Sequence, residues 1–299
     1  MQTSLMGQTA FLVVLLAAII SLLAPGLQRR LQKLLHRRPP TLWAAPILLT
    51  AVFAAASWYA GAFSVPLTLM VLAYTLAPVA VAYLQGPAIE PRPTALDFLG
   101  IAILWLPIEF AAGGRLVPRA AQGFLHSVAY GIAILLGLIL WTAFRSFAGM
   151  KYNPPRSKRD LWLPLMGFAL LAPVLAVVGI AIGFIPPPHL PTQSAGRIAA
   201  AIGIIYAGTA LPEEILFRAL IQNLLMQRFG ATTRTLLLAS FIFGCAHLDN
   251  GPQPVPNWRY MIMATIAGYA YGKVFQKASS VLSSAGLHMM VDWTKHFFF

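Results

Sequence analysis

Two adjacent glutamates and an arginine stand in a stretch of the sequence that is otherwise almost entirely apolar. They occur in Leu211-Pro-Glu-Glu-Ile-Leu-Phe-Arg218, and the whole chain has only eight acidic residues. An uncompensated charge in hydrocarbon costs several kcal/mol. Ionisable groups in such a place are therefore candidates for function, and Glu213 and Glu214 are the first candidates in this sequence.

The spacing of these residues predicts different roles for the two glutamates. Pro212 suits the first turn of a helix, so we expect a helix to begin there, with Glu213 and Glu214 at its positive end. Glu214 and Arg218 are four residues apart and share a helix face, where they can form a structural ion pair. Glu213 points about 100° away and stays available for chemistry. Alternatively, both carboxylates only cap a helix at the membrane edge.

Two further apolar segments carry polar residues at helical spacing. Phe243 and His247 are four residues apart, and so are His288 and Asp292. Residues four apart lie on the same face of a helix, and polar faces of membrane helices normally turn towards the interior of the bundle. We therefore expect the three polar clusters to converge on one site, which Phe243 would line.

A convergent set of this kind is suited to hydrolysis. Glu213 can take a proton from water, and His247 can share that water or protonate the leaving amine. General acid–base groups of this type are typically worth about 10² to 10⁴-fold in rate. His288, steadied by Asp292, can donate to a developing oxyanion. The predicted catalytic residues are Glu213, Glu214, His247, His288 and Asp292.

The composition indicates an integral membrane protein. The chain is 59% hydrophobic and only 10% charged, whereas soluble domains are about 25% charged. Apolar stretches of about 17–25 residues, the length that spans a bilayer as a helix, recur along the chain. We therefore predict an all-α fold, a polytopic integral membrane helical bundle of roughly eight to ten helices.

The expected spans divide the chain into two parts. A basic loop around residues 151–159 separates residues 1–160, which carry no recognisable motif, from residues 161–299, which contain the candidate residues 213–292. The spans are expected at about 8–25, 41–61, 65–85, 97–112, 125–147, 161–185, 197–212, 234–248, 258–275 and 280–297, with a further helix at 212–228.

These boundaries leave one conflict inside the predicted site. If the span at 197–212 runs inward and the span at 234–248 runs outward, His247 lies at the far end of its helix from Glu213. Either the helix at 212–228 climbs back into the membrane, or the boundaries are several residues off.

The net charge of +13 does not indicate a nucleic-acid partner. The basic residues lie in short loops at helix ends, as they do in the cytoplasmic loops of membrane proteins. The basic run at residues 29–38 predicts a cytoplasmic loop after the first span and an N-terminus outside. We expect the lipid bilayer as a partner and no nucleic acid, and the short loops favour a prokaryotic inner membrane.

In this order and spacing, the three motifs resemble those of the CPBP family, membrane proteases related to type II CAAX prenyl endopeptidases. That series is Glu-Glu-x-x-x-Arg, Phe-x-x-x-His and His-x-x-x-Asn/Asp, and here it occupies residues 213–218, 243–247 and 288–292. The resemblance covers about residues 197–297. It implies a glutamate-dependent intramembrane endopeptidase. By that likeness Glu213 activates water, His247 assists, and His288 with Asp292 forms the oxyanion site.

Two positions depart from the family pattern. Ala219 follows the arginine where the family usually has glycine, and Asp292 stands where the eukaryotic prenyl proteases have asparagine. An ionised aspartate cannot donate to an oxyanion, so we expect Asp292 to orient His288.

We expect no cofactor and no metal, and a membrane-associated or lipid-anchored protein or peptide as substrate. The resemblance permits prenylated C-termini, bacteriocin leaders and other membrane-anchored peptides.

Two other functions are compatible with these residues. His288, Asp292 and His296 repeat every four residues, and with His247 or Glu213 they would form a ligand set for a metal-dependent membrane hydrolase. The sequence has no His-Glu-x-x-His run to support it. The second alternative is not an enzyme: a proton-coupled carrier, since buried glutamate and histidine also form proton relays, or a membrane scaffold. The chain lacks the matching halves typical of transporters.

Overall fold

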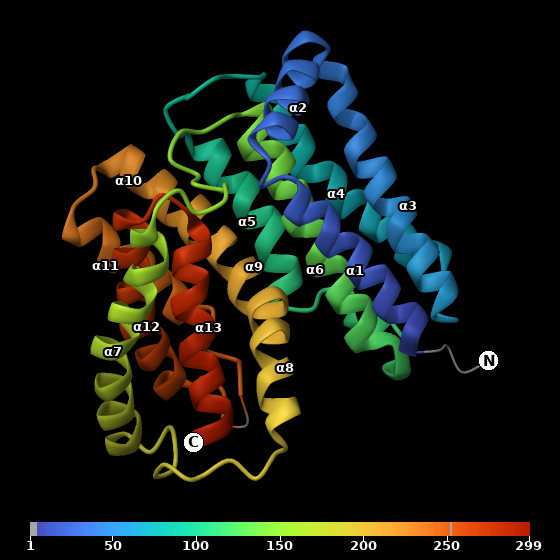
Figure 1. Cartoon of the computed structure of the whole chain (residues 1–299). Coiled ribbons are helices and arrows are strands. Elements are labelled where there is room, and N and C mark those ends of the chain that lie inside the picture. The colour runs from blue at the N-terminus through green and yellow to red at the C-terminus, as the bar shows by residue number, and fades with distance from the viewer. Residues whose placement is uncertain (1–4, 252) are drawn as a thin grey trace. The chain divides into compact units, whose positions relative to one another are not determined.

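Helices form almost all of the ordered secondary structure of the chain. The computed structural model describes residues 5–251 and 253–299, and no strand occurs among them. Contacts divide the chain into two compact units, Met1–Ala148 and Gly149–Phe299 (Figure 1). The predicted all-α helical bundle is therefore confirmed. The predicted boundary at residue 160 separates the part of the sequence with motifs from the part without them. A division by contacts does not test it, so it stays a prediction.

In the first unit, helices pack around α6 and the π-helical segment that continues it. α1, α3 and α5 pack against α6, and α2 packs against η4. Many residues of α6 and η4 are fully buried, so this helix forms the centre of the unit. The helices are α1 (Leu5–Ser21), α2 (Pro25–Arg37), α3 (Ala44–Tyr59), α4 (Val65–Gln85), α5 (Ala95–Glu109) and α6 (Gln122–Leu138), with η4 at Ile139–Phe144 and short 3₁₀ turns at Pro39–Trp43, Gly114–Leu116 and Arg119–Ala121.

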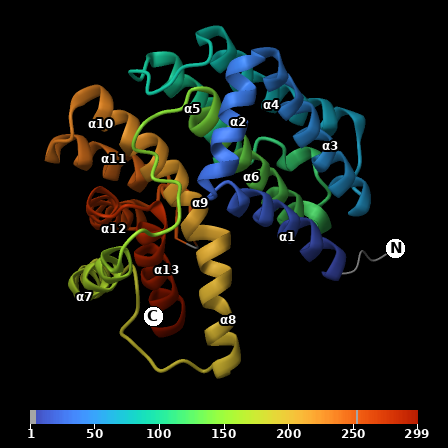
Figure 2. The same cartoon turned by 45° about the horizontal axis from the view of Figure 1, so that its top comes forward.

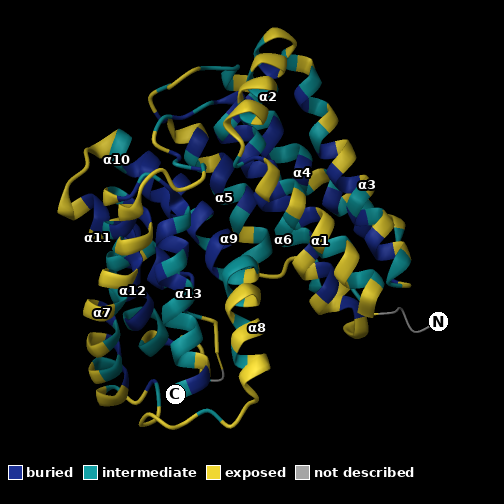
Figure 3. Cartoon of the chain, viewed as in Figure 1, coloured by how far each residue is buried: buried dark blue, intermediate teal, exposed yellow. Residues whose placement is uncertain are grey.

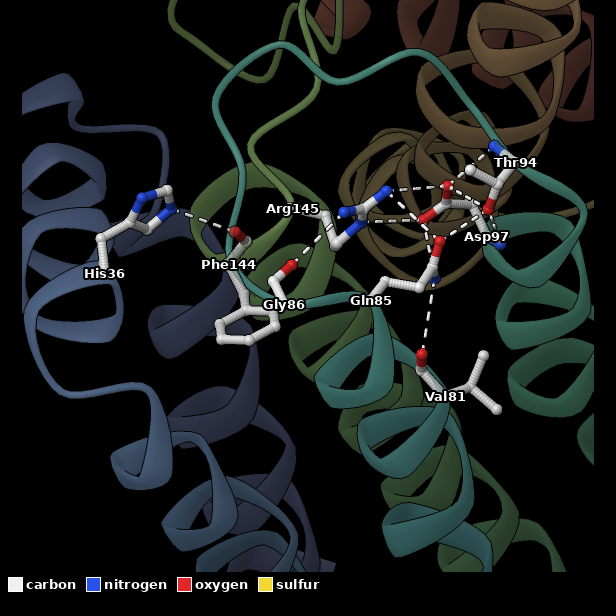
Figure 4. A network of polar contacts seen from close by, with 8 residues as sticks. All are labelled: His36, Val81, Gln85, Gly86, Thr94, Asp97, Phe144 and Arg145. Atoms are coloured by element: carbon white, nitrogen blue, oxygen red, sulfur yellow. Dashed lines mark hydrogen bonds and ion pairs between the residues drawn. The ribbon is translucent and has the colours of Figure 1, made fainter.

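A buried ion pair ties the start of α5 to the end of η4 (Figure 4). Arg145 contacts both carboxylate oxygens of Asp97, at 3.1 and 3.2 Å. Asp97 also completes a capping box with Thr94 at the helix start. Arg145 donates further hydrogen bonds to the Gln85 side chain and the Gly86 carbonyl. Each buried charge therefore has partners, as burial of ions requires.

In the second unit, α13 is the central helix. It packs against α7 and α12 on one side and against α8 and α9 on the other (Figures 1 and 2). Side chains on several faces of α13 therefore meet different helices. The helices are α7 (Lys158–Ala181), α8 (Ala195–Ile205), α9 (Leu211–Glu214), α10 (Asn223–Phe229), α11 (Thr233–Cys245), α12 (Trp258–Lys277) and α13 (Val281–Phe298), with π-helical segments η5 at Tyr206–Ala210 and η6 at Ile215–Gln222.

One continuous helix carries the two glutamates. α8, η5, α9, η6 and α10 follow one another without a break and form a single stretch, Ala195–Phe229. The prediction that a helix begins at Pro212, with Glu213 and Glu214 at its N-terminus, is therefore wrong. Proline has no N–H to bond the carbonyl four residues earlier, and its ring collides with that carbonyl. The wider π-helical turn of η5 just before Pro212 makes room for the ring, so the helix continues. π-Helical turns often occur at functional sites.

Several helices are long and apolar enough to cross a membrane. Among the described residues these are Pro39–Tyr59, Val65–Gln85, Arg119–Phe144, Lys158–Ala181 and Ala195–Phe229. The pair α1 and α2, bent by 84°, counts as a sixth if it is one span. The chain is thus an integral, multi-pass membrane protein. The other expected spans correspond to α5, α11, α12 and α13, which do not pass the same test of length and composition.

Outward-facing apolar side chains support this assignment. On α7, Leu161, Leu170 and Val177 are each more than 60% exposed. No residue of α8 is buried, and Figure 3 shows this helix largely as exposed. In water such surfaces would be costly at about 25 cal/mol per Å², whereas lipid chains can cover them without cost.

The segment before α7 holds the turn between α12 and α13. Lys151 donates to three carbonyls at the end of α12, those of Phe275, Gln276 and Ala278. Asp160 accepts from the backbone N–H and the hydroxyl of Ser279. The last carbonyls of a helix have no partner within it, so Lys151 acts as a cap. This loop fixes where α13 begins.

Candidate active site

Glu214 is fully buried and has two cationic or polar partners. The Nε of Arg218 lies 3.1 Å from one carboxylate oxygen of Glu214, and both side chains have no exposed surface. The Nδ1 of His288 lies 3.2 Å from the other oxygen. The predicted pairing of Glu214 with Arg218 is present, and the pair is joined to α13 through His288.

His288 lies among three carboxylates. Its Nε2 is 3.3 Å from Asp292 and 3.9 Å from Glu213, while its Nδ1 faces Glu214. Ionised carboxylates only accept hydrogen bonds. Both nitrogens of His288 therefore carry protons when Asp292 and Glu214 are ionised, and the neutral ring requires a proton on one of those carboxyl groups. The cluster shares protons as a unit, which suits acid–base chemistry.

Aromatic rings enclose the buried arginine. The guanidinium of Arg218 lies 4.7 Å from the Phe243 ring centre and 5.8 Å from that of Tyr271. Tyr271 in turn stacks on His288, with ring centres 4.6 Å apart. Gly268 makes this packing possible, because a Cβ there would lie 2.8 Å from Phe243. Phe243 thus contacts Arg218, His247 and His288, and its role in lining a functional site stays a prediction.

His247 lies just beyond the end of α11 and is buried. Its Nδ1 lies 2.9 Å from the Phe243 carbonyl. A carbonyl only accepts, so Nδ1 carries the proton and Nε2 of the neutral ring keeps a lone pair. The ring lies between Phe243, at 4.7 Å, and Tyr260, at 4.6 Å. A base or a water-binding group could act from Nε2.

The helical hairpin at Gly230 resolves the conflict about His247. α10 ends at Phe229, Gly230 has a φ of 90°, and α11 turns back beside η6. Glu213 and His247 lie equally far along the chain before and after Gly230. Since both arms are helical, both residues come to a similar level. The sequence predicted that one helix ends and another begins at Pro212, which placed Glu213 at a helix end and His247 far from it. The continuous helix removes this conflict.

Two cavities meet at Asp292. The smaller one, of about 80 Å³, is lined by His247, His288 and Asp292 together with residues of α7 and α12. The larger one, of about 710 Å³, lies beside α8 and is also lined by Asp292. The side chains of Glu213 and Asp292 are 21% and 29% exposed, whereas that of Glu214 is fully buried. Asp292 thus faces both cavities, whereas Glu214 lines neither of them.

The structure brings the predicted residues together, and His296 lines the larger cavity beside Asp292 without contacting a carboxylate of the cluster. His296 is exposed and packs on Phe297. Within residues 5–251 and 253–299, no group of three His, Cys, Asp or Glu side chains is arranged to hold a metal ion. The ligand set that the sequence permitted, with His296 as a member, is not assembled.

Sequence reasoning missed three residues at this site. Tyr271 stacks on His288, Tyr260 meets His247 edge to face, and Lys295 lines both cavities. A signal for the tyrosines was present, since Tyr260, Ala264, Ala267 and Tyr271 follow the spacing of one helix face. Aromatic residues in an apolar chain have many other uses, so that spacing alone did not single them out.

Comparison with known proteins identifies the segment that carries this site. No curated protein and no solved structure matches the chain significantly. Residues 195–294 match the family model described as Rce1-like, Type II CAAX prenyl endopeptidase Rce1-like. The matched segment runs from α8 into α13 and contains the three motifs. Over residues 195–294, this membrane protein is therefore similar to the type II CAAX prenyl endopeptidases described as Rce1-like.

Proposed function

We propose that the protein is a membrane-embedded, glutamate-dependent endopeptidase that cleaves a membrane-associated or lipid-anchored protein. The observation that carries this proposal is the placement of His288 within 3.9 Å of Glu213 and 3.3 Å of Asp292. Glu213 lies on α9, whereas His288 and Asp292 lie on α13, about 75 residues further along the chain. Their convergence inside the matched segment supports one hydrolytic site rather than separate structural ion pairs.

Glu213 acts as the base in this mechanism. It takes a proton from water as the water oxygen adds to the scissile carbonyl, and His247 holds that water through Nε2. The carbon–nitrogen bond then breaks, and the amine leaves with the proton that Glu213 had taken. General acid–base catalysis of this kind is worth about 10² to 10⁴-fold.

His288 and Asp292 form the oxyanion site. Asp292 orients the ring by accepting the single N–H of Nε2 before the reaction, and His288 then donates this N–H to the oxygen that becomes negative. Donors that are fixed before the reaction stabilise such charge strongly. Glu214 and Arg218 act as positioning residues: Glu214 holds Nδ1 of His288, and Arg218 balances the charge of Glu214.

The larger cavity is the route by which the substrate enters. It is lined by the apolar residues Ala201, Ile204 and Ile205 of α8 and reaches Asp292. A lipid-modified peptide suits such a surface, and the family description refers to prenyl substrates. We place the protein in the inner membrane of a prokaryotic cell, on the basis of its short basic loops.

The test compares protein termini in membranes of cells that carry the wild type, Glu213→Gln or Glu109→Gln. Glu109 accepts a hydrogen bond from Trp105 in the first unit, so its variant serves as the control. We expect a set of processed termini in wild type and control that falls about 100-fold or more in Glu213→Gln. Equal termini in all three strains, at equal protein levels, would refute the endopeptidase function.

A chelator distinguishes the metal-dependent alternative. Cleavage by the purified protein should be unchanged by a strong zinc chelator, because the proposed mechanism uses only carboxylates and histidines. Activity that is lost on chelation and restored by Zn²⁺ would instead favour a metal hydrolase.

A further inference from the structure

Lys295 is a cation beside the candidate active site that the proposed mechanism does not use. It lies on α13, three residues after Asp292, so the two side chains lie on one side of the helix about one turn apart. It lines both cavities that meet at Asp292. Its Nζ lies 4.6 Å from the Phe184 ring centre and 4.2 Å from that of Tyr260.

These two rings hold the ammonium group but do not complete its bonding. An aromatic face attracts a cation through its electron density, yet an ammonium has three N–H donors that need acceptors. The charge of Asp292 acts on Lys295 across the cavity. The ion pairs found among the described residues nevertheless do not include Lys295, and Asp292 is directed to His288 instead.

The cavity around Lys295 is otherwise mostly apolar. Phe184, Ile185 and Phe299 line both cavities together with Lys295, and Tyr260 covers the side towards His247. A lysine that only balanced the acidic cluster would be expected to contact one of its carboxylates. Lys295 instead lines the same two cavities as Asp292, beside the groups that would cleave a substrate. This is the place where a substrate anion would find a cation.

We propose that Lys295, held by Phe184 and Tyr260, binds a carboxylate of the peptide substrate and thereby sets which peptide bond reaches Glu213. The proposal rests on the proposed endopeptidase function and names a chemical feature of its substrate. The carboxylate can come from the free C-terminus or from an acidic side chain. Since Lys295 lies about one helical turn from Asp292, the carboxylate lies only a few residues from the scissile bond.

The test uses short farnesylated peptides in detergent micelles, in matched pairs. One pair differs in a free or an amidated C-terminus, and the other has Asp or Asn at a position near the cleaved bond. We expect wild type to cleave one carboxylate form about 10- to 100-fold faster in kcat/KM than its neutral partner, as expected for a charge-assisted hydrogen bond. The pair that shows the preference identifies the source of the carboxylate.

Variants then assign that preference to Lys295. Lys295→Met should abolish the preference, so that the carboxylate and neutral forms are cleaved with equal kcat/KM, whereas Lys295→Arg should keep much of the preference. Lys273→Met is the control, because Lys273 also lies over a ring, that of Tyr269 at 5.4 Å, but lines neither cavity. Equal losses for both peptide forms in Lys295→Met would overturn the proposal.

Binding measurements separate this proposal from the proposed function. The same peptides are titrated into the wild type, Glu213→Gln and Lys295→Met. If nothing is cleaved but the carboxylate form binds more tightly through Lys295, the endopeptidase function fails and the carboxylate site stands. If peptides are cleaved but both forms bind and react alike, the function stands and the carboxylate site fails. Absence of binding for both forms also overturns the site.

Discussion

At the scale of single residues, the site depends on charges that are buried but paired. Glu214 and Arg218 have no exposed surface and lie 3.1 Å apart, and His288 adds a second partner for Glu214. Removing one member of a buried pair leaves the other charge without compensation, which is more costly than the pair is worth. The free energy lost when these charges leave water is therefore offset only while Glu214, Arg218 and His288 are all present.

Replacement of Arg218 tests this dependence. Arg218→Met should destabilise the protein by about 3–5 kcal/mol, because Glu214 would lose its counter-ion in a dry environment. Arg228→Met is the matched control, since Arg228 is exposed on α10, and should change stability by about 0.5 kcal/mol or less. Thermal unfolding in detergent measures both. Equal melting temperatures of the two variants would contradict the buried-pair interpretation.

A double variant identifies the cause of that loss. Glu214→Leu combined with Arg218→Met removes both charges and leaves apolar side chains, so stability should recover in large part. Activity should not recover, because His288 loses the group that orients its Nδ1. Recovery of both stability and activity would mean that the pair does not position His288.

At the scale of elements, two features place the residues. The π-helical turns η5 and η6 flank Glu213 and Glu214 within one long helix, and the loop that contains Lys151 and Asp160 fixes the start of α13. Partial burial lowers the pKa of Lys151, and the charge of Asp160 opposes this effect. Lys151 has a φ of 51°, a left-handed conformation that its three carbonyl contacts help to hold.

Lys151→Met should therefore destabilise the second unit by about 1–3 kcal/mol, since three carbonyls lose a charged donor. The difference should depend on pH. A lysine whose pKa is lower in the folded than in the unfolded chain binds fewer protons when folded, so stability rises with pH through the window between the two pKa values. The wild type should thus gain stability relative to Lys151→Met as the pH rises towards about 10.4.

Melting temperatures of both proteins between neutral and alkaline pH measure this effect. Lys158→Met provides a control, because Lys158 is an exposed lysine at the start of α7. Its difference from wild type should stay constant over the same range. A difference for Lys151→Met that shrinks as the pH rises would contradict the assigned direction of the pKa shift.

At the scale of the whole molecule, the bilayer acts as the solvent of the fold. Five helices among the described residues, or six with the bent pair α1 and α2, are long and apolar enough to cross it. A helix in hydrocarbon satisfies its own backbone hydrogen bonds. This explains how a chain with only 10% charged residues remains folded.

Extraction from membranes tests this conclusion. The protein should stay in the membrane fraction after washing with alkaline carbonate, which removes peripheral proteins, and should be released by mild detergent, since several spanning helices hold it in place. Release of the folded protein by carbonate alone would contradict a multi-pass arrangement. A peripheral membrane protein from the same cells provides the control for the wash.

The sequence by itself determined the structural class of this protein and the residues from which its chemistry is proposed. The apolar runs specified membrane helices, because a bilayer accepts few other structures. The four-residue spacing specified the contacts of Glu214 with Arg218, Phe243 with His247 and His288 with Asp292, because such contacts lie within one helical turn. These local relations need no knowledge of the fold.

Only the tertiary structure decided how the three local pairs meet. The unbroken passage of the helix through Pro212, the reversal at Gly230 and the central position of α13 depend on packing between distant segments, which spacing along one helix does not encode. For the same reason, Lys295 gave no signal in the sequence. Its proposed role arises from Phe184 and Tyr260, which belong to other parts of the chain and reach it only in the folded unit.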